Sequence, residues 1–142
     1  MYRIGKTFRF EAAHYLLDSD SEPCHNLHGH SYKVEVVLAA PDLVKGMVWD
    51  FCHLSYWWEG MKASYDHALI IAPHCLGDAL TGAVVANGGK VIAVAGEPTA
   101  ENMAKEFHDR LRQFLAAEKR AGVKVESVKV WETESAWAEY RP

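Results

Sequence analysis

The sequence predicts an α+β domain, and the order of its elements is the first observation behind that prediction. Along the 142 residues, alternating and helical patterns of apolar side chains follow one another as strand, strand, helix, strand, helix, strand. The first two strands are joined by a polar loop, which favours antiparallel pairing. The two helices are amphipathic and could cover one face of a four-stranded antiparallel sheet. We therefore expect one domain over residues 1–142.

The first two strands are indicated by alternation. Over residues 2–14 the apolar side chains share one parity with His14, while charged side chains mostly take the other. This is the pattern of a half-buried strand. A polar loop with turn-forming residues follows over residues 18–23. The next alternation predicts a strand from about His30 to Ala39.

The first helix is expected from about Phe51 to Ser64, with Asp50 as its N-cap. Apolar residues recur along it at helical spacing. Trp57 and Trp58 belong to this apolar set, and we expect them in the core or at an interface and not in a ligand site.

The second helix has the clearest limits in the chain. Thr99 is a natural N-cap, and Glu101 is favourably placed in the first turn. Gly122 is expected to end the helix. The apolar stripe consists of Met103, Phe107, Leu111, Phe114 and Leu115.

Shorter segments complete the pattern. The run Ala68–Ile71 is apolar and is ended by Pro73, and a short strand is expected over Lys90–Val94. A strand over Val123–Thr133 and a short one near residues 137–140 end the chain. A sheet built this way has open edges, so oligomerisation is expected to close them.

The composition excludes several classes of protein. With 49% hydrophobic and 24% charged residues, it is that of an ordinary globular chain. The formal net charge is −4 and no block of basic residues occurs, which argues against nucleic acid as a partner. No membrane span or signal peptide is expected. The three cysteines are an odd number, which argues against a disulfide framework. We expect a cytoplasmic protein.

Three histidines form the candidate metal site. His28 and His30 are two residues apart, so in an extended segment they face the same way. His14 ends the preceding strand on its apolar parity, and pairing of the two strands would bring all three to one end of the hairpin. Gly29 allows a close backbone approach there. Three neutral imidazoles suit a catalytic zinc ion with one open position.

Cys24 lies four residues before His28, and the residues leave its role open. A thiol near a cation loses its proton more readily and can act as a base. Alternatively, the same thiol could be the fourth ligand of a closed structural zinc site.

Asp66 and His67 place a carboxylate beside an imidazole, and such a pair can relay a proton to or from a thiol. Glu132 shares parity with Val128 and Val130, so it is expected to point toward a covered face. A lone carboxylate there would bind a pair of N–H donors. The remaining candidates are treated as structural or surface residues: Cys52, Cys75, His25, His53, His74 and His108.

Six motifs occur in the order found in the family of 6-pyruvoyl-tetrahydropterin synthase and 6-carboxy-tetrahydropterin synthase, and together they cover nearly the whole chain. The sequence therefore resembles this family. The matching segments are Phe10–His14, Cys24–Val34, Asp50–Phe51, Asp66–His67, Pro98–Asn102 and Glu132–Thr133.

The resemblance implies a tunnelling fold, in which subunits join their sheets into a barrel, usually as a hexamer built from two trimers with sites between subunits. It implies zinc on His14, His28 and His30. It further implies that Cys24 is the proton-abstracting base, that Asp66 and His67 form a relay with it, and that Glu132 grips the pterin ring. These last four residues are the predicted catalytic set, and Glu132 is also the predicted substrate-binding residue.

The resemblance also implies a substrate, 7,8-dihydroneopterin triphosphate, from which triphosphate is eliminated. In the carboxy branch acetaldehyde is lost as well, which leads toward queuosine and other deazapurines. The spacing Cys-x-x-x-His-Gly-His, from Cys24 to His30, resembles the bacterial carboxy branch. The chain departs from compact members by a longer segment over residues 74–96. The alternatives are the pyruvoyl product, a zinc hydrolase, and a zinc-binding protein without turnover.

Overall fold

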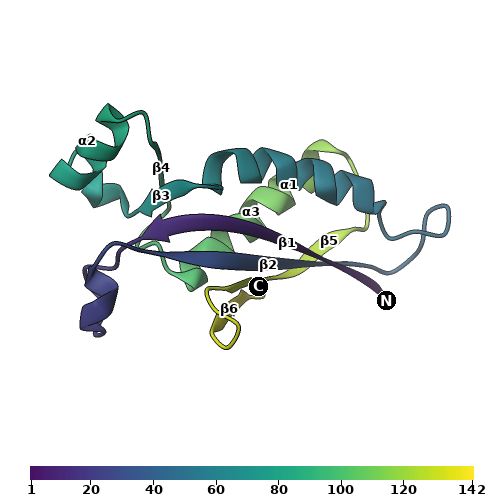
Figure 1. Ribbon diagram of the computed structural model, residues 1–142. Coiled ribbons are helices and arrows are strands. Elements are labelled where there is room, and N and C mark those ends of the chain that lie inside the picture. Colours follow the sequence, from purple (N-terminus) through teal and green to yellow (C-terminus); the bar gives the residue numbers. More distant parts are fainter.

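A long antiparallel pair, β1 with β2, forms the centre of the computed structural model, which describes residues 1–142 (Figure 1). The sheet has six strands in the order β4-β3-β1-β2-β5-β6. The strands are β1 (Tyr2–His14), β2 (His28–Ala40), β3 (Ala68–Ile71), β4 (Lys90–Ala93), β5 (Lys124–Trp131) and β6 (Trp137–Tyr140). The helices are α1 (Phe51–Tyr65), α2 (Ala79–Ala86) and α3 (Ala100–Ala117), with short 3₁₀ turns at Glu22–His25 and Pro73–Cys75.

The predicted α+β class is confirmed, but the sheet is larger than the predicted four strands and is not wholly antiparallel. β3 lies parallel to β1, and β4 lies parallel to β3. All four residues of β3 are buried, so the strand has no alternation to distinguish it from any other apolar run. The segment between β3 and β4, which contains α2, is the crossover connection that the parallel pair of β3 and β4 requires.

The third helix, α2, lies within the long segment over residues 74–96 and was not expected. Its sequence carries no charged residue, so no polar face marks it as amphipathic. The one sequence feature that indicates this helix is its N-cap, Asp78, whose side chain accepts a hydrogen bond from the backbone N–H of Thr81 at 2.7 Å. Figure 1 shows α2 at one end of the molecule, beside β3 and β4.

The starts of the two longer helices agree with the sequence. The Asp50 side chain accepts from the N–H of Cys52, and the Thr99 hydroxyl accepts from the N–H of Asn102. The predicted end at Gly122 is wrong, because α3 already ends at Ala117. Lys119 takes a left-handed φ of 51° and turns the chain there, while Gly122 lies in the turn that leads into β5.

The core lies between the sheet and the helices α1 and α3, which cover one face of it (Figure 1). Trp57 and Trp58 are both buried in it, as predicted. Phe10 stacks on Tyr32 with ring centroids 4.8 Å apart, and the edge of Phe107 packs against it at 6.1 Å. No helix of this fold is both long enough and apolar enough to cross a membrane.

We predict that Phe107→Ala lowers the free energy of unfolding by about 3–5 kcal/mol, since it removes a fully buried ring and leaves a cavity. Phe51→Ala is the matched control. Its ring is 48% exposed, so the loss should stay below about 1 kcal/mol. Urea unfolding followed by circular dichroism measures both. Equal losses for the two variants would contradict the placement of α3.

Candidate metal centre

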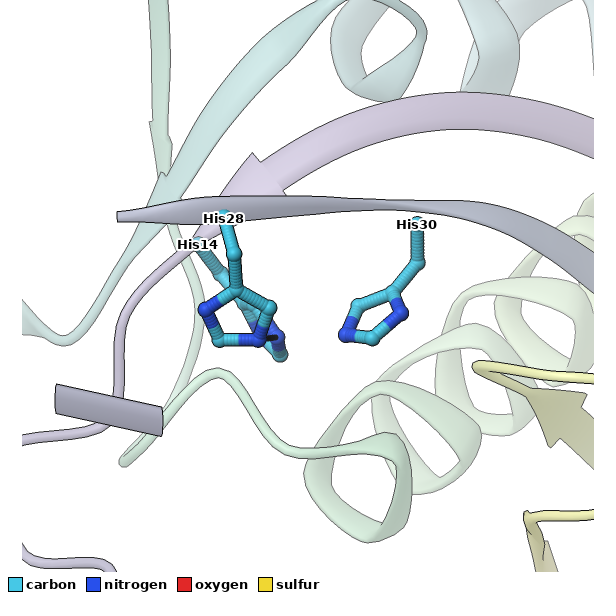
Figure 2. Close-up of side chains that lie close together, drawn as sticks. All are labelled: His14, His28 and His30. Atoms are coloured by element: carbon cyan, nitrogen blue, oxygen red, sulfur yellow. Dashed lines mark hydrogen bonds between the residues drawn. The ribbon is translucent and has the colours of Figure 1, made fainter. Parts of the chain in front are cut away.

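Three histidine side chains meet where β1 ends and β2 begins (Figure 2). The register of this pair places His14 opposite His28 and Ala12 opposite His30. Because alternate residues of a strand share a face, all three imidazoles lie on the face that carries the core. Gly29 keeps the strands close: a Cβ there would lie 3.3 Å from the carbonyl oxygen of Ala12.

The ring nitrogens of the three histidines converge. One nitrogen from each ring lies within 4.8 Å of the others, and the Nε2 atoms of His14 and His28 are 3.1 Å apart. Zinc–nitrogen bonds of about 2.0–2.1 Å place two tetrahedral ligands about 3.3–3.4 Å apart. Figure 2 shows the rings pointing into one common space. The spacing is therefore close to that of a three-histidine metal site.

Backbone carbonyls fix two of the rings. The Nδ1 of His14 lies 2.7 Å from the carbonyl oxygen of Pro98, and the Nδ1 of His28 lies 2.7 Å from that of Asn26. A carbonyl oxygen only accepts, so each Nδ1 carries the proton and each Nε2 presents its lone pair. Two lone pairs facing each other at 3.1 Å repel unless a cation lies between them. The donor set thus fits a divalent ion such as zinc.

Burial keeps the site in its metal-binding protonation state. Burial is the main reason that the pKa of His14 is lowered to about 4; the nearby His28 and His30 also lower it, and the hydrogen bond to the Pro98 carbonyl opposes the shift. Burial also lowers the pKa of His30, with a smaller contribution from His28. Both rings are therefore neutral at pH 7, and neutral imidazole is the form that coordinates metals.

Cys24 lies in the 3₁₀ turn Glu22–His25 of the loop between β1 and β2. Its carbonyl accepts from the N–H of Leu16 at 2.8 Å, and its own N–H donates to the carbonyl of Ser21 at 2.9 Å. The thiol is half-buried and is not among the ligand atoms that converge with the three histidines.

Asp66 and His67 form the expected pair, with Asp66 Oδ2 3.1 Å from His67 Nδ1. The other oxygen of Asp66 accepts from the N–H of Glu11 at 2.9 Å, which is the main reason its pKa is lowered. His67 has an unusual φ of 58° and a side chain that is 77% exposed. Left-handed backbone at a non-glycine residue costs free energy and is concentrated at functional sites.

His67 lines a cavity of about 480 Å³, and His30 of the histidine cluster is also among the residues that line it. The cavity is also lined by Glu11, Ala13 and Ser31. In β1 and β2 these residues have the parity opposite to that of His14 and His30. The side chains of Glu11, Ala13 and Ser31 that share this cavity with His67 therefore belong to the sheet face opposite to that of His14.

Glu132 follows β5 directly and continues the parity of the buried Val128 and Val130, as expected. Burial raises its pKa, and the negative charge of Glu101 raises it further, whereas His28 opposes the shift. The Glu132 carboxylate is therefore within electrostatic range of Glu101 in the first turn of α3 and of His28. Sequence reasoning missed Glu101 as part of this site, because it was seen only as a helix-start residue.

The other cysteines and histidines lie outside the cluster. Cys52 is exposed and Cys75 is buried. His53 stacks on Trp49, and His74 lies 3.7 Å from Glu97 on the surface. The carbonyl of Pro98, which orients His14, was also missed, because a backbone acceptor leaves no signal in the side-chain pattern.

A sequence model described as 6-pyruvoyl tetrahydropterin synthase matches residues 3–142, nearly the whole chain. The chain belongs to the 6-pyruvoyl tetrahydropterin synthase family. Within this family it is 35% identical to the 6-carboxy-5,6,7,8-tetrahydropterin synthase of Aquifex aeolicus, over 99% of this chain and 98% of that protein. It is 31% identical to the enzyme of the same name from Haemophilus influenzae, over 99% of each chain.

Solved structures give the same family fold. An uncharacterized protein from Wolinella succinogenes superposes with a TM-score of 0.81 at 26% identity, covering 99% of this chain and 97% of that one. The 6-pyruvoyl tetrahydropterin synthase of Plasmodium vivax superposes with a TM-score of 0.71 at 16% identity, covering 100% and 99%. The predicted tunnelling fold of the synthase family is therefore confirmed.

Proposed function

We propose that this protein is a zinc-dependent 6-carboxy-5,6,7,8-tetrahydropterin synthase. It converts 7,8-dihydroneopterin triphosphate and water into 6-carboxytetrahydropterin, acetaldehyde and triphosphate. The observation that carries the proposal is the convergence of three imidazoles with a thiol close by in sequence but outside the ligand set. The 35% and 31% identical relatives named for this activity support it.

His14, His28 and His30 would hold the zinc ion through their Nε2 or remaining free ring nitrogens. Bound there, zinc supplies Lewis-acid polarisation of the hydroxyl and carbonyl oxygens on the substrate side chain. The carbonyls of Pro98 and Asn26 keep two of these rings in the tautomer that coordinates.

Cys24 would act as the base. Its thiolate takes a proton from the side-chain carbon of the pterin, and His67, oriented by Asp66, returns a proton at the neighbouring carbon. The short loop that carries Cys24 runs directly into His28, so base and metal ligands are set by one continuous segment.

A complete site requires more than one copy of the chain. His67 shares its cavity with side chains of the sheet face opposite to that of His14, so we infer that the relay that serves one centre comes from another subunit. The sheet edges are suited to such assembly: β3 covers only residues 12–14 of β1, and β6 is a four-residue edge strand. We propose a hexamer of two trimers, in which strands of neighbouring subunits pair.

The carboxy product is preferred to the pyruvoyl product because curated relatives carry the carboxy name and the spacing Cys-x-x-x-His-Gly-His agrees with that branch. The product would then enter deazapurine synthesis, including that of queuosine. Incubation of the zinc-loaded protein with 7,8-dihydroneopterin triphosphate, followed by mass spectrometry, tests this directly. A carboxypterin with acetaldehyde supports the proposal. If the only product is a pyruvoyl pterin, the protein belongs to the pyruvoyl branch. If zinc is bound and no pterin product forms, both synthase activities are ruled out.

Glu132 is proposed to hold the pterin ring by accepting two N–H bonds. We predict that Glu132→Gln raises KM and lowers kcat/KM by about 10–100-fold, since a charged acceptor is replaced by an amide that also presents a donor. Steady-state kinetics over a range of pterin concentrations measures the effect.

Glu134→Gln is the matched control, since Glu134 is an exposed glutamate two residues farther along the same loop. It should leave both constants within about twofold of the parent. If Glu132→Gln lowered kcat and left KM unchanged, Glu132 would move protons and would not anchor the ring.

A further inference from the structure

A second cavity, of about 630 Å³, lies at the opposite end of α3 from the metal centre. The metal centre uses the carbonyl of Pro98, just before α3 begins, whereas the cavity is lined from His108 onward, by the turn after α3 and by the start of β5. At about 1.5 Å per residue, the ten positions between Pro98 and His108 span about 15 Å. The two sites are therefore separate.

The cavity has an excess of positive charge. Its cationic side chains are those of Arg112, Lys119, Arg120 and Lys124, and no aspartate or glutamate lines it. Pro142 also lines the cavity. Among the four cations only Arg112 has a side-chain carboxylate within 4.0 Å, that of Asp109 at 3.9 Å. Arg120 donates to the backbone carbonyl of Val48 at 3.0 Å, but no carboxylate lies within 4.0 Å of Arg120, Lys119 or Lys124. Like charges gathered in this way repel one another, and a bound anion would relieve that repulsion.

Two buried polar groups at the cavity lack hydrogen-bond partners. His108 is only 3% exposed, and neither of its ring nitrogens makes a hydrogen bond. Its Nδ1 lies 3.5 Å from Asp109 Oδ1, so Nε2 is the ring nitrogen without a carboxylate oxygen within 4.0 Å. The Nε of Arg120 is likewise buried and unpaired. Buried polar atoms without partners are costly, which is typical of a site that a ligand completes.

We propose that this cavity binds a phosphomonoester or free phosphate. Arg112, Lys119 and Lys124 would contact the phosphate oxygens, and His108 would supply a buried hydrogen bond. The same cavity has an apolar wall of Leu115, Val123 and Val125, which suits the organic part of a phosphorylated small molecule. Free phosphate and a phosphomonoester carry the same dianionic group. Binding of either one at this cavity does not depend on the reaction proposed for the metal centre.

Isothermal titration of the zinc-loaded full chain with inorganic phosphate and, separately, with adenosine monophosphate tests the site. We expect saturable binding at one site per chain, weakened by added salt because the contacts are ionic. Tighter binding of the nucleotide would show that the apolar wall is used. Lys119→Gln combined with Lys124→Gln should weaken the affinity by about tenfold or more. The charge-matched control, Lys6→Gln with Lys62→Gln, alters lysines outside the cavity and should leave the affinity unchanged.

His108→Phe separates binding from packing. The ring of His108 packs edge-on against Tyr140 at 5.0 Å, and phenylalanine keeps that contact. We expect the variant to retain its Tm and to lose phosphate affinity. Unchanged affinity in both cavity variants would place the anion at the metal centre and overturn the proposal. Absence of phosphate binding by the parent protein would also overturn the proposal. If, in that case, the double lysine variant changed its oligomeric state, the cavity would be assigned to a contact between copies of the chain.

Discussion

Cys24→Ala is expected to lower turnover of the pterin substrate by about 10³-fold or more while leaving zinc bound. A general base contributes about 10²–10⁴-fold to rate, and neither Cys52 nor Cys75 belongs to the histidine cluster or to the loop that carries Cys24. Zinc should remain at about one ion per chain, because the three converging ligand atoms all come from histidines. Metal analysis and product formation, measured on the same preparation, check the two halves of the prediction.

Cys52→Ala is the matched control, because Cys52 is exposed in the first turn of α1 and away from the histidines. It should change neither zinc content nor rate. Loss of zinc from Cys24→Ala, with unfolding, would instead make the thiol a fourth ligand of a structural site. Undiminished turnover of the pterin would remove Cys24 from the mechanism and favour hydrolysis by zinc-bound water.

The convergence of the three histidines could be predicted from the sequence because it depends on strand parity and on the pairing of two neighbouring strands. Once β1 and β2 pair in the register that sets His14 opposite His28, the parity of His28 and His30 puts all three histidines on one face. The same rule placed Glu132 beyond the buried residues of β5. In each case the relevant information lies within one strand or one hairpin.

Features that arise from packing between distant segments could not be predicted in this way. β3 has no alternation because both of its faces are covered, so its parallel pairing with β1 had no signal in the pattern. The negative charge of Glu101 raises the pKa of Glu132, although the two residues lie on different elements. The end of α3 at Ala117 depends on a left-handed lysine, a conformation that the residue type disfavours.

His30→Gln is expected to remove zinc from the protein and to lower turnover by about 10³-fold or more, since Lewis-acid stabilisation by a metal is worth several kcal/mol. His30 is the ligand best suited to this test, because it is half-buried and its ring nitrogens make no hydrogen bond to the backbone comparable to those of His14 and His28. His74→Gln, at an exposed histidine remote from the cluster, should keep both zinc and activity.

His30, which has no hydrogen bond to the backbone, and His14, which has one, should also differ in their effect on folding. In the presence of a chelator, His30→Gln should unfold at the same urea concentration as the parent, because only metal-derived stability is lost. His14→Ala should be less stable even then, by about 1–3 kcal/mol, because it leaves the buried carbonyl of Pro98 without its donor. If His14→Ala matched the parent in chelator, the bond to Pro98 would not orient the ring. If His30→Gln kept its zinc, the three imidazoles would not act as one site.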